Sequence, residues 1–263
     1  MKNYSMIKRP GYKKYLIMLI IVALFFIFSN NLNLTFGEFV GGIPRVYDFI
    51  SRMFPPDLTN LSLFLKAAWQ TIEIAFVGTI LGTIGGFILG FLGARNIVPN
   101  KIINYIVRGI MDTFRGLSEI IWALIFVAMV GLGPFPGILA LSIHVSGALG
   151  RFFSETIENC RPHLIDVVRA AGGSKLQVIS HAIIPEVKPL FMNYIFYYFE
   201  HSIRAATILG LVGAGGIGVQ LVVRIKLFRY HEVLTILIII VLMVFIFDKI
   251  SAYVRKRNVD ANL

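Results

Sequence analysis

Residues 120–150, IIWALIFVAMVGLGPFPGILALSIHVSGALG, contain no Asp, Glu, Lys or Arg. An apolar run of this length predicts membrane helices, each of which needs about 20 residues to cross a bilayer. Residues 131–137, GLGPFPG, fall in its middle, and glycine and proline there favour a tight turn. We therefore expect two spans joined by a short external turn. The first begins earlier, near Met111, so that Arg115 and Glu119 lie on its inner half.

The composition extends this interpretation to the whole chain. Of 263 residues, 57% are hydrophobic and 15% are charged, and the mean hydropathy is +0.77, whereas soluble domains carry about 25% charged residues. The net charge of +11 would suit a nucleic-acid-binding protein, but almost no soluble face is available for such a patch. We expect an all-α integral membrane protein with about six spans in one transmembrane domain, residues 1–263, and no nucleic-acid partner.

Basic residues gather at both ends of the chain, at positions 2, 8, 9, 13 and 14 and again at 249 and 255–257. By the positive-inside rule, the N-terminus (1–14) and the C-terminus (254–263) are both expected to be cytoplasmic, which requires an even number of spans. The predicted spans besides the two described above are 15–31, 67–93, 189–211 and 232–253.

Residues 32–66 contain Pro44, Pro55 and Pro56 with nearly balanced charge, which predicts an external loop that carries a surface helix. In the second span, glycines recur at spacings of three or four residues, at positions 78, 82, 85, 86, 90 and 93. Small residues at such spacing let two helices approach closely in lipid. We expect this face to pack within the chain rather than against a second copy.

Three basic residues, Arg224, Lys226 and Arg229, fall between the last two spans on the predicted external side. This placement disobeys the positive-inside rule. Two explanations stay open: the segment re-enters the membrane as a short helix, or its charge attracts an anion.

We expect residues 151–188 to form a cytoplasmic loop between two spans, and within it residues 166–185, DVVRAAGGSKLQVISHAIIP, to form a polar, helix-forming segment. Polar residues such as Asp166 and Arg169 supply one face of the helix and apolar residues such as Val167 and Val168 the other, and Gly172 and Gly173 interrupt the helix. A bent helix outside the bilayer that keeps both faces fits a groove of a soluble partner protein. The alternative is an amphipathic loop that lies on the membrane surface.

The fifth predicted span carries Glu200 and Arg204 one helical turn apart, with His201 beside them. Charged residues within a membrane are costly and normally face a polar cavity or each other. Arg204 offers a permanently charged planar fork that suits phosphate-like oxygens, and Glu200 would hold it in place. Arg115 and Glu119 repeat this spacing, and His144 lies near the middle of the fourth span; these are weaker pathway candidates.

Several motifs are excluded by their context. Gly213, Gly215 and Gly218 spell G-x-G-x-x-G, but they follow a lipid-length helix rather than a strand, so we expect a glycine-rich bend instead of a dinucleotide site. The chain contains no G-x-x-x-x-G-K-[ST] phosphate loop, and its single cysteine, Cys160, rules out an intramolecular disulfide. We expect no catalytic residues, no metal site and no cofactor bound by this chain.

The segment 166–185 resembles the cytoplasmic loop shared by permease subunits of bacterial ABC importers. Asp166 stands where that family usually has Glu, Val167 and Val168 where it has two alanines, and Gly172 holds the glycine of the pattern. The resemblance implies that this segment couples the chain to an ATPase. The candidate coupling residues are Asp166, Arg169, Ala170, Gly172, Gly173, Ser174, Ile184 and Pro185.

Further motifs narrow the resemblance to the permease subunit of phosphonate-type ABC importers: Glu119 with WALIFV at 122–127, GLGPFPG at 131–137, and Arg204 leading into GLVGAGGIG at 210–218. Ser118 departs from a proline usual before that Glu. The resemblance implies type I importer architecture in a bacterial inner membrane and alternating access.

The same resemblance implies the partners of the chain. They are a second copy of this subunit, two cytoplasmic ATPases that use ATP and Mg, and an external binding protein that delivers phosphonates, phosphonate esters, phosphite or related phosphorus oxyanions. The alternatives are an importer for methionine or another amino acid, and an ion-coupled secondary transporter.

Overall fold

The computed structural model describes residues 12–32 and 36–260, without the side chains at 12, 13, 36, 38, 39 and 255–260. Of the basic residues that predict the orientation of the two ends, those at 2, 8 and 9 lie outside the described residues and those at 13 and 255–257 are described without side chains, so that orientation stays a prediction. Every regular element within these ranges is helical, which confirms the all-α prediction.

The chain divides into two compact units, Met1–Phe54 and Pro55–Leu263. In the first unit, α1 (Tyr12–Asn31) covers the first predicted span, and its described apolar side chains are exposed, as suits a helix surrounded by lipid. The second helix, α2 (Phe36–Ser51), contains Pro44 and confirms a helix within the predicted loop 32–66.

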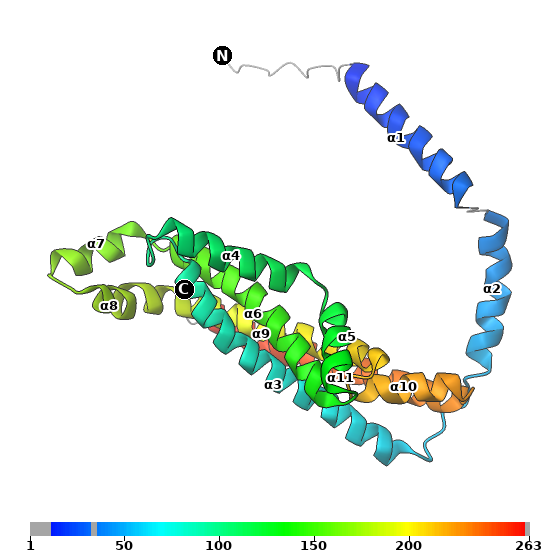
Figure 1. Cartoon of the computed structure of the whole chain (residues 1–263). Helices are drawn as coiled ribbons and strands as arrows, with labels where there is room; N and C mark the ends of the chain where they lie inside the picture. The colour runs from blue at the N-terminus through cyan, green and yellow to red at the C-terminus, as the bar shows by residue number, and fades with distance from the viewer. Residues whose placement is uncertain (1–11, 33–35, 261–263) are drawn as a thin grey trace. The chain divides into compact units, whose positions relative to one another are not determined.

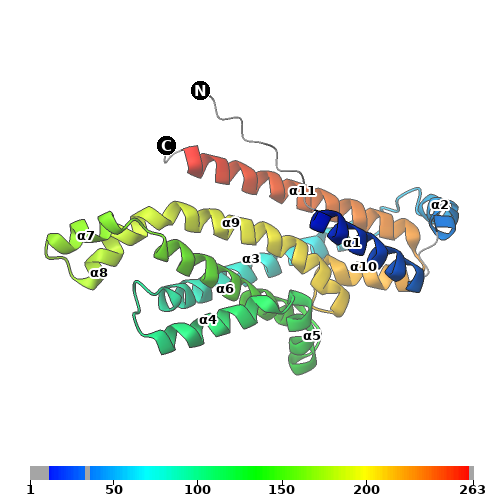
Figure 2. The same ribbon diagram turned by 90° about the horizontal axis from the view of Figure 1, so that it is seen from above.

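Four long helices form the body of the second unit: α3 (Leu61–Gly93), α6 (Pro134–Glu158), α9 (Ile184–Leu209) and α11 (Tyr230–Asp260) (Figures 1 and 2). Helix α3 packs against α6 and α9, and α9 also packs against α11. Within the described residues, five helical stretches including α1 are long and apolar enough to cross a membrane. The bent pair α4 and α5 would make a sixth, in agreement with the predicted number.

Two boundaries differ from the prediction. Helix α3 begins at Leu61 rather than near residue 67, so its first turns belong to the segment predicted as loop. Helix α6 continues to Glu158 and α9 already begins at Ile184, which shortens the predicted connecting loop 151–188 at both ends.

The contact between α3 and α6 depends on four glycines, Gly78, Gly82, Gly86 and Gly90, which we call the glycine seam. A Cβ atom added to any of them would come within 2.6 to 2.8 Å of a Cβ atom on α6, closer than real Cβ contacts allow. The four α6 residues concerned are Leu141, Val145, Leu149 and Phe153. The glycines therefore pack within the chain, as predicted.

The third predicted span is not one straight helix. Helix α4 (Lys101–Gly116) and helix α5 (Glu119–Val130) meet at a bend of 90°. Leu117 and Ser118 adopt extended backbone there, and Ser118 Oγ accepts a hydrogen bond from the N–H of Ile120, which starts α5 afresh. The expectation of a continuous helix from Met111 is wrong, because Leu117 and Ser118 leave the helical conformation and Ser118 caps a new helix.

Helix α9 ends in the glycine-rich bend that the sequence predicts. A short 3-10 turn, η2 (Gly210–Val212), leads to Gly213, whose φ of 86° lies in the left-handed region that favours glycine. The chain then forms α10 (Ile217–Lys226), which packs against α3 and α11. Arg224 and Arg229 both pair with the buried Glu232 at the start of α11. Two of the three basic residues in this segment are thus paired within the chain, but they share one carboxylate, so the two arginines and Glu232 together keep a net charge of +1.

The glycine seam predicts opposite effects for the same substitution at two helix positions. Gly82→Ala should lower the free energy of unfolding by about 1–3 kcal/mol through overpacking against Val145, which outweighs the ~1 kcal/mol that alanine gains in a helix. Gly109→Ala, in α4, should raise it, because no atom lies within 4 Å of the added Cβ. Unfolding of the purified protein in a denaturing detergent titration measures both; equal effects would contradict the packing account.

Candidate functional site

The segment predicted to dock a partner forms two short helices around a glycine turn. Helix α7 (Pro162–Ala170) ends before Gly172, whose φ is 80°. Helix α8 (Lys175–Val178) then begins at a capping box in which Ser174 and Gln177 exchange hydrogen bonds. In Figures 1 and 2 the two helices project beyond one end of the long helices. The bent-helix geometry agrees with the prediction.

One face of this segment is anchored and the other is free. Ile165, Val168 and Val178 pack against a core cluster that includes residues of α6 and α9. On the opposite face Val167 is 56% exposed and Leu176 is 77% exposed. Asp166, Arg169, Ala170, Gly172, Ser174, Ile184 and Pro185 are also exposed, and Gly173 is half-buried. Exposed apolar side chains beside charged ones are typical of a protein-binding surface.

The base of the segment is fixed to the start of α9. Glu186 accepts hydrogen bonds from Arg161 Nε at 2.8 Å and from the Cys160 Sγ at 2.5 Å, so the residues before α7 are tied to the first turn of α9. From α8 the chain continues without a break through a π-helical turn, η1 (Ile179–Ile183), into α9. Displacement of α7 and α8 must therefore displace the start of α9.

The predicted pair of Glu200 and Arg204 is present on α9, where Arg204 Nη1 donates to Glu200 Oε1 at 2.6 Å. The Glu200 side chain is only 7% exposed, whereas the Arg204 side chain is 42% exposed. The carboxylate thus anchors the guanidinium while part of its fork remains available to another group.

Glu119 lies between two histidines, an arrangement that the sequence analysis did not foresee. Its Oε1 lies 3.2 Å from His144 Nε2 and 3.6 Å from His201 Nδ1, and the two imidazole rings stack with centroids 6.1 Å apart. These residues come from α5, α6 and α9. The sequence signal was the presence of Glu119, His144 and His201 within otherwise apolar segments, and the bend before Glu119 was needed to bring it to the histidines.

His144 is held at both ring nitrogens. Nδ1 lies 3.2 Å from the carbonyl oxygen of Leu117, and Nε2 faces Glu119. Both partners are acceptors, so a neutral imidazole can donate to only one of them, whereas an imidazolium donates to both. Together with Arg204 and the two carboxylates, the cluster is net positive only when His144 and His201 are both protonated.

A cavity of about 270 Å³ lies at this cluster. Glu119, His201 and Arg204 provide its polar lining, and Ile120, Ala205, Ile208 and Leu209 provide the rest. Arg115 is not among the lining residues. It pairs with Asp112 at 3.1 Å on α4. Although Arg115 and Glu119 are four residues apart in the sequence, they do not form a pair on one helix, because the helix breaks between them.

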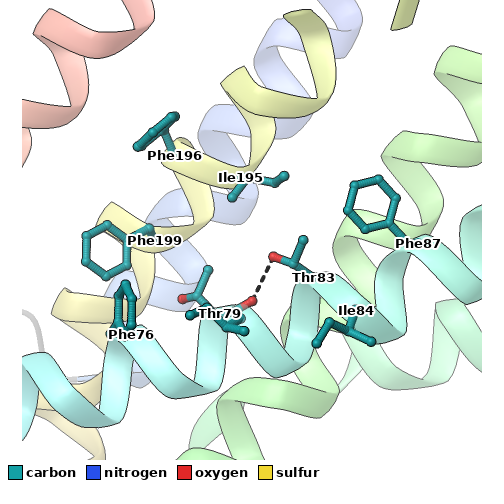
Figure 3. A pocket seen from close by; sticks show the side chains of 9 residues that line it. Phe76, Thr79, Thr83, Ile84, Phe87, Ile195, Phe196 and Phe199 are labelled. Carbon is teal, nitrogen blue, oxygen red and sulfur yellow. Dashed lines mark hydrogen bonds between the residues drawn. The ribbon is translucent and has the colours of Figure 1, made fainter. Parts of the chain in front are cut away.

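A second cavity, of about 280 Å³, lies between α3 and α9 (Figure 3). Its lining is aliphatic and aromatic apart from two threonines, and both hydroxyls already donate hydrogen bonds, Thr83 to the carbonyl oxygen of Thr79 and Thr79 to Ser202. This cavity offers no charged group or spare donor to an anion. Within the described residues no group of three His, Cys, Asp or Glu side chains is arranged so that it could hold a metal ion.

The Cys160 thiol gives a direct test of the base of the segment. Burial, the hydrogen bond to Glu186 and the charge of that carboxylate raise the pKa of Cys160 from 9.0 to about 12. At pH 8 only about one thiol in ten thousand would be ionised, so alkylation should be very slow. Because the folded pKa is raised, the stabilisation is complete below pH 9 and is lost as the pH rises toward 12.

Glu186→Gln should speed alkylation of Cys160 at least tenfold at pH 8, since it removes the carboxylate charge that opposes ionisation. As Cys160 is the only cysteine, iodoacetamide labelling reports on it alone, and Asp166→Asn serves as a control that removes a nearby exposed carboxylate. Equal labelling rates in the two variants and in the unsubstituted protein would contradict the contact.

Comparison with known proteins places the chain in a family. Residues 78–259 match the family described as binding-protein-dependent transport system inner membrane component. The chain is 39% identical to the transport system permease protein HtxC of Stutzerimonas stutzeri, over 87% of this chain and 81% of that protein. It is 35% identical to the phosphite transport system permease protein PtxC of the same organism, over 82% and 79% of the two chains.

Among solved structures, an inward-facing methionine ABC transporter chain is similar at a TM-score of 0.67 and 21% identity, over 77% of this chain and 99% of that one. This likeness shows that the two chains share the fold of type I ABC importer permeases. The chain belongs to the binding-protein-dependent transport system inner membrane component family, and is a membrane-spanning permease subunit of an ABC importer rather than an enzyme.

Proposed function

We propose that this permease carries phosphite, phosphonates or related phosphorus oxyanions. The observation that carries the proposal is the identity of 35% to a phosphite permease over most of both chains. The Arg204 fork supports it locally, because Glu200 holds one side of the guanidinium and leaves part of it free beside a cavity, although a net positive charge there requires both neighbouring histidines to be protonated. A planar guanidinium suits two oxygens of one phosphorus centre.

The segment formed by α7 and α8 is the proposed docking element for a separate ATPase subunit that uses ATP and Mg. Its exposed apolar face supports this role, as does the absence of a phosphate loop in the sequence. Movement of the docked segment would displace α9 through η1 and the contacts of Glu186. Because α9 also carries His201 and Arg204, ATP-driven motion at one end reaches the cavity at the other, as alternating access requires.

The proposed assembly contains two copies of this chain, two ATPases and an external phosphonate-type binding protein. The end that carries α7 and α8 would face the cytoplasm, and both termini would lie on that side, as the basic residues at the chain ends predict. The bilayer is that of a bacterial cell membrane. Membership of the transport family disfavours the ion-coupled alternative.

The methionine alternative is less well supported. The solved methionine transporter is 21% identical to this chain, and a shared fold does not fix the solute.

Arg204→Ala should lower ATP-driven uptake of phosphite into proteoliposomes roughly tenfold to a hundredfold, the loss expected for one charged hydrogen bond. Arg204→Lys should keep part of the activity, because it restores the charge without the planar fork. Arg45→Ala, on α2, is the matched control and should transport normally. Unchanged phosphite uptake by Arg204→Ala, or uptake of methionine but not of phosphite, would contradict the assignment.

Gly172→Pro should abolish uptake while leaving membrane insertion intact, because proline fixes φ near −65° and the turn needs a φ of 80°. Gly172→Asn should keep most of the uptake, since asparagine tolerates the left-handed region and no atom lies within 4 Å of the added Cβ. The measurement is uptake at matched amounts of inserted protein. Normal transport by the proline variant would refute the coupling role.

A further inference from the structure

The largest of the described cavities lies away from the Arg204 cluster. It has a volume of about 930 Å³ and is formed by one stripe of α4, the loop before it, and Arg151 of α6. The stripe includes Lys101, Tyr105, Gly109 and Asp112, which repeat at helical spacing. The cavity lies at the end of the unit where α3 and α6 finish and α4 begins, the end that also carries α7 and α8 (Figure 1).

The cavity is strongly basic. Arg95, Lys101, Arg108 and Arg151 line it, with Asp112 as the one acidic lining residue. When the ion-pair partners outside the lining are included, five cations face three carboxylates, an excess of two positive charges: Arg95, Lys101, Arg108, Arg115 and Arg151 against Asp112, Glu155 and Glu158.

The excess charge resides in two side chains. Arg108 is paired with Glu158 at 2.6 Å and Arg151 with Glu155 at 2.6 Å. Over the part of the chain that the structure describes, neither the guanidinium of Arg95 nor the ammonium of Lys101 has a hydrogen bond or ion pair. Two available cations beside two fixed ones form a site for an anion with several oxygens.

An apolar ridge borders this basic cavity. Ile102, Ile106 and Ile110 follow one another at intervals of four residues on α4, and all three are exposed; Ile106 also lines the cavity. Tyr105, at the same level, is 82% exposed. A phospholipid is complementary to this surface, because its anionic phosphate matches the basic cavity and its acyl chains match the apolar ridge. Basic pockets between membrane helices are known to suit such headgroups.

We propose that this cavity binds a phosphate-type anionic group through Arg95 and Lys101, and that the adjoining apolar ridge makes an anionic phospholipid the favoured source. The site is separate from the Arg204 cavity, with which it shares no lining residue. It does not depend on which solute is transported. A free phosphorus oxyanion has the same recognition chemistry and is distinguished by experiment.

The test uses the complete chain, purified with its ATPase subunits in detergent and incubated with phosphatidylglycerol or phosphatidylcholine. Native mass spectrometry measures the lipid retained. Arg95→Gln with Lys101→Gln should lower phosphatidylglycerol retention roughly tenfold, given the contribution of each cation near a membrane surface. Lys188→Gln with Lys249→Gln is the matched control, because it removes the same charge from residues that do not line the cavity.

Gly109→Leu provides a second variant that keeps every charge. Open space surrounds the position of a Cβ at Gly109, so the leucine side chain should fill the cavity and also lower retention. Equal retention of phosphatidylglycerol by the unsubstituted chain and both cavity variants would overturn the phospholipid assignment, as would retention of phosphatidylcholine equal to that of phosphatidylglycerol.

Calorimetric titration with inorganic phosphate is the second arm. Binding that is lost in the cavity variants but kept in the control, without selective lipid retention, would keep the phosphate-type site and assign it to a free oxyanion. If neither probe separates the cavity variants from the control, the site does not exist.

Discussion

The close approach of α3 and α6 along the glycine seam is the constraint on which the rest of the second unit depends. With no side chain at Gly78, Gly82, Gly86 and Gly90, the α6 side chains reach the backbone of α3 directly. The hydrophobic effect contributes little to the association of helices that already lie in lipid. Dispersion and close backbone contact therefore hold α3 and α6 together. A rigid pair of helices results, and α9 packs against both of them.

The seam also determines where the ionisable side chains meet. The same helix that packs on the seam carries His144 at its middle, and the hydrogen bond from Thr79 to Ser202 joins α3 to α9 one residue after His201. The 90° bend before α5 then brings Glu119 to both histidines. Charges that would be costly alone in a membrane therefore satisfy each other, and Arg204 keeps part of its fork free for a solute.

Much of this arrangement could be predicted from the sequence, because long uncharged runs of residues indicate membrane helices. The glycines of α3, the bend at Gly213, the turn at Gly172 and the pair of Glu200 and Arg204 are local patterns, and all of them occur as expected.

The contacts between distant segments could not be predicted in the same way. Nothing in the spacing of Arg115 and Glu119 reveals that Ser118 starts a new helix, and only that break separates the two side chains. The cavity at Arg95 and Lys101 likewise depends on how the loop before α4 folds back toward α6.

The central claim is that α7 and α8 bind a separate ATPase and transmit its motion along α9. A photo-cross-linking amino acid at Leu176, which is 77% exposed, tests this most directly. Illumination of the membrane-embedded complex should yield a covalent product with the ATPase subunit, and the same amino acid at the exposed Trp69 of α3 should yield none. A cross-link from position 69 alone, or from neither position in an actively transporting complex, would contradict the account.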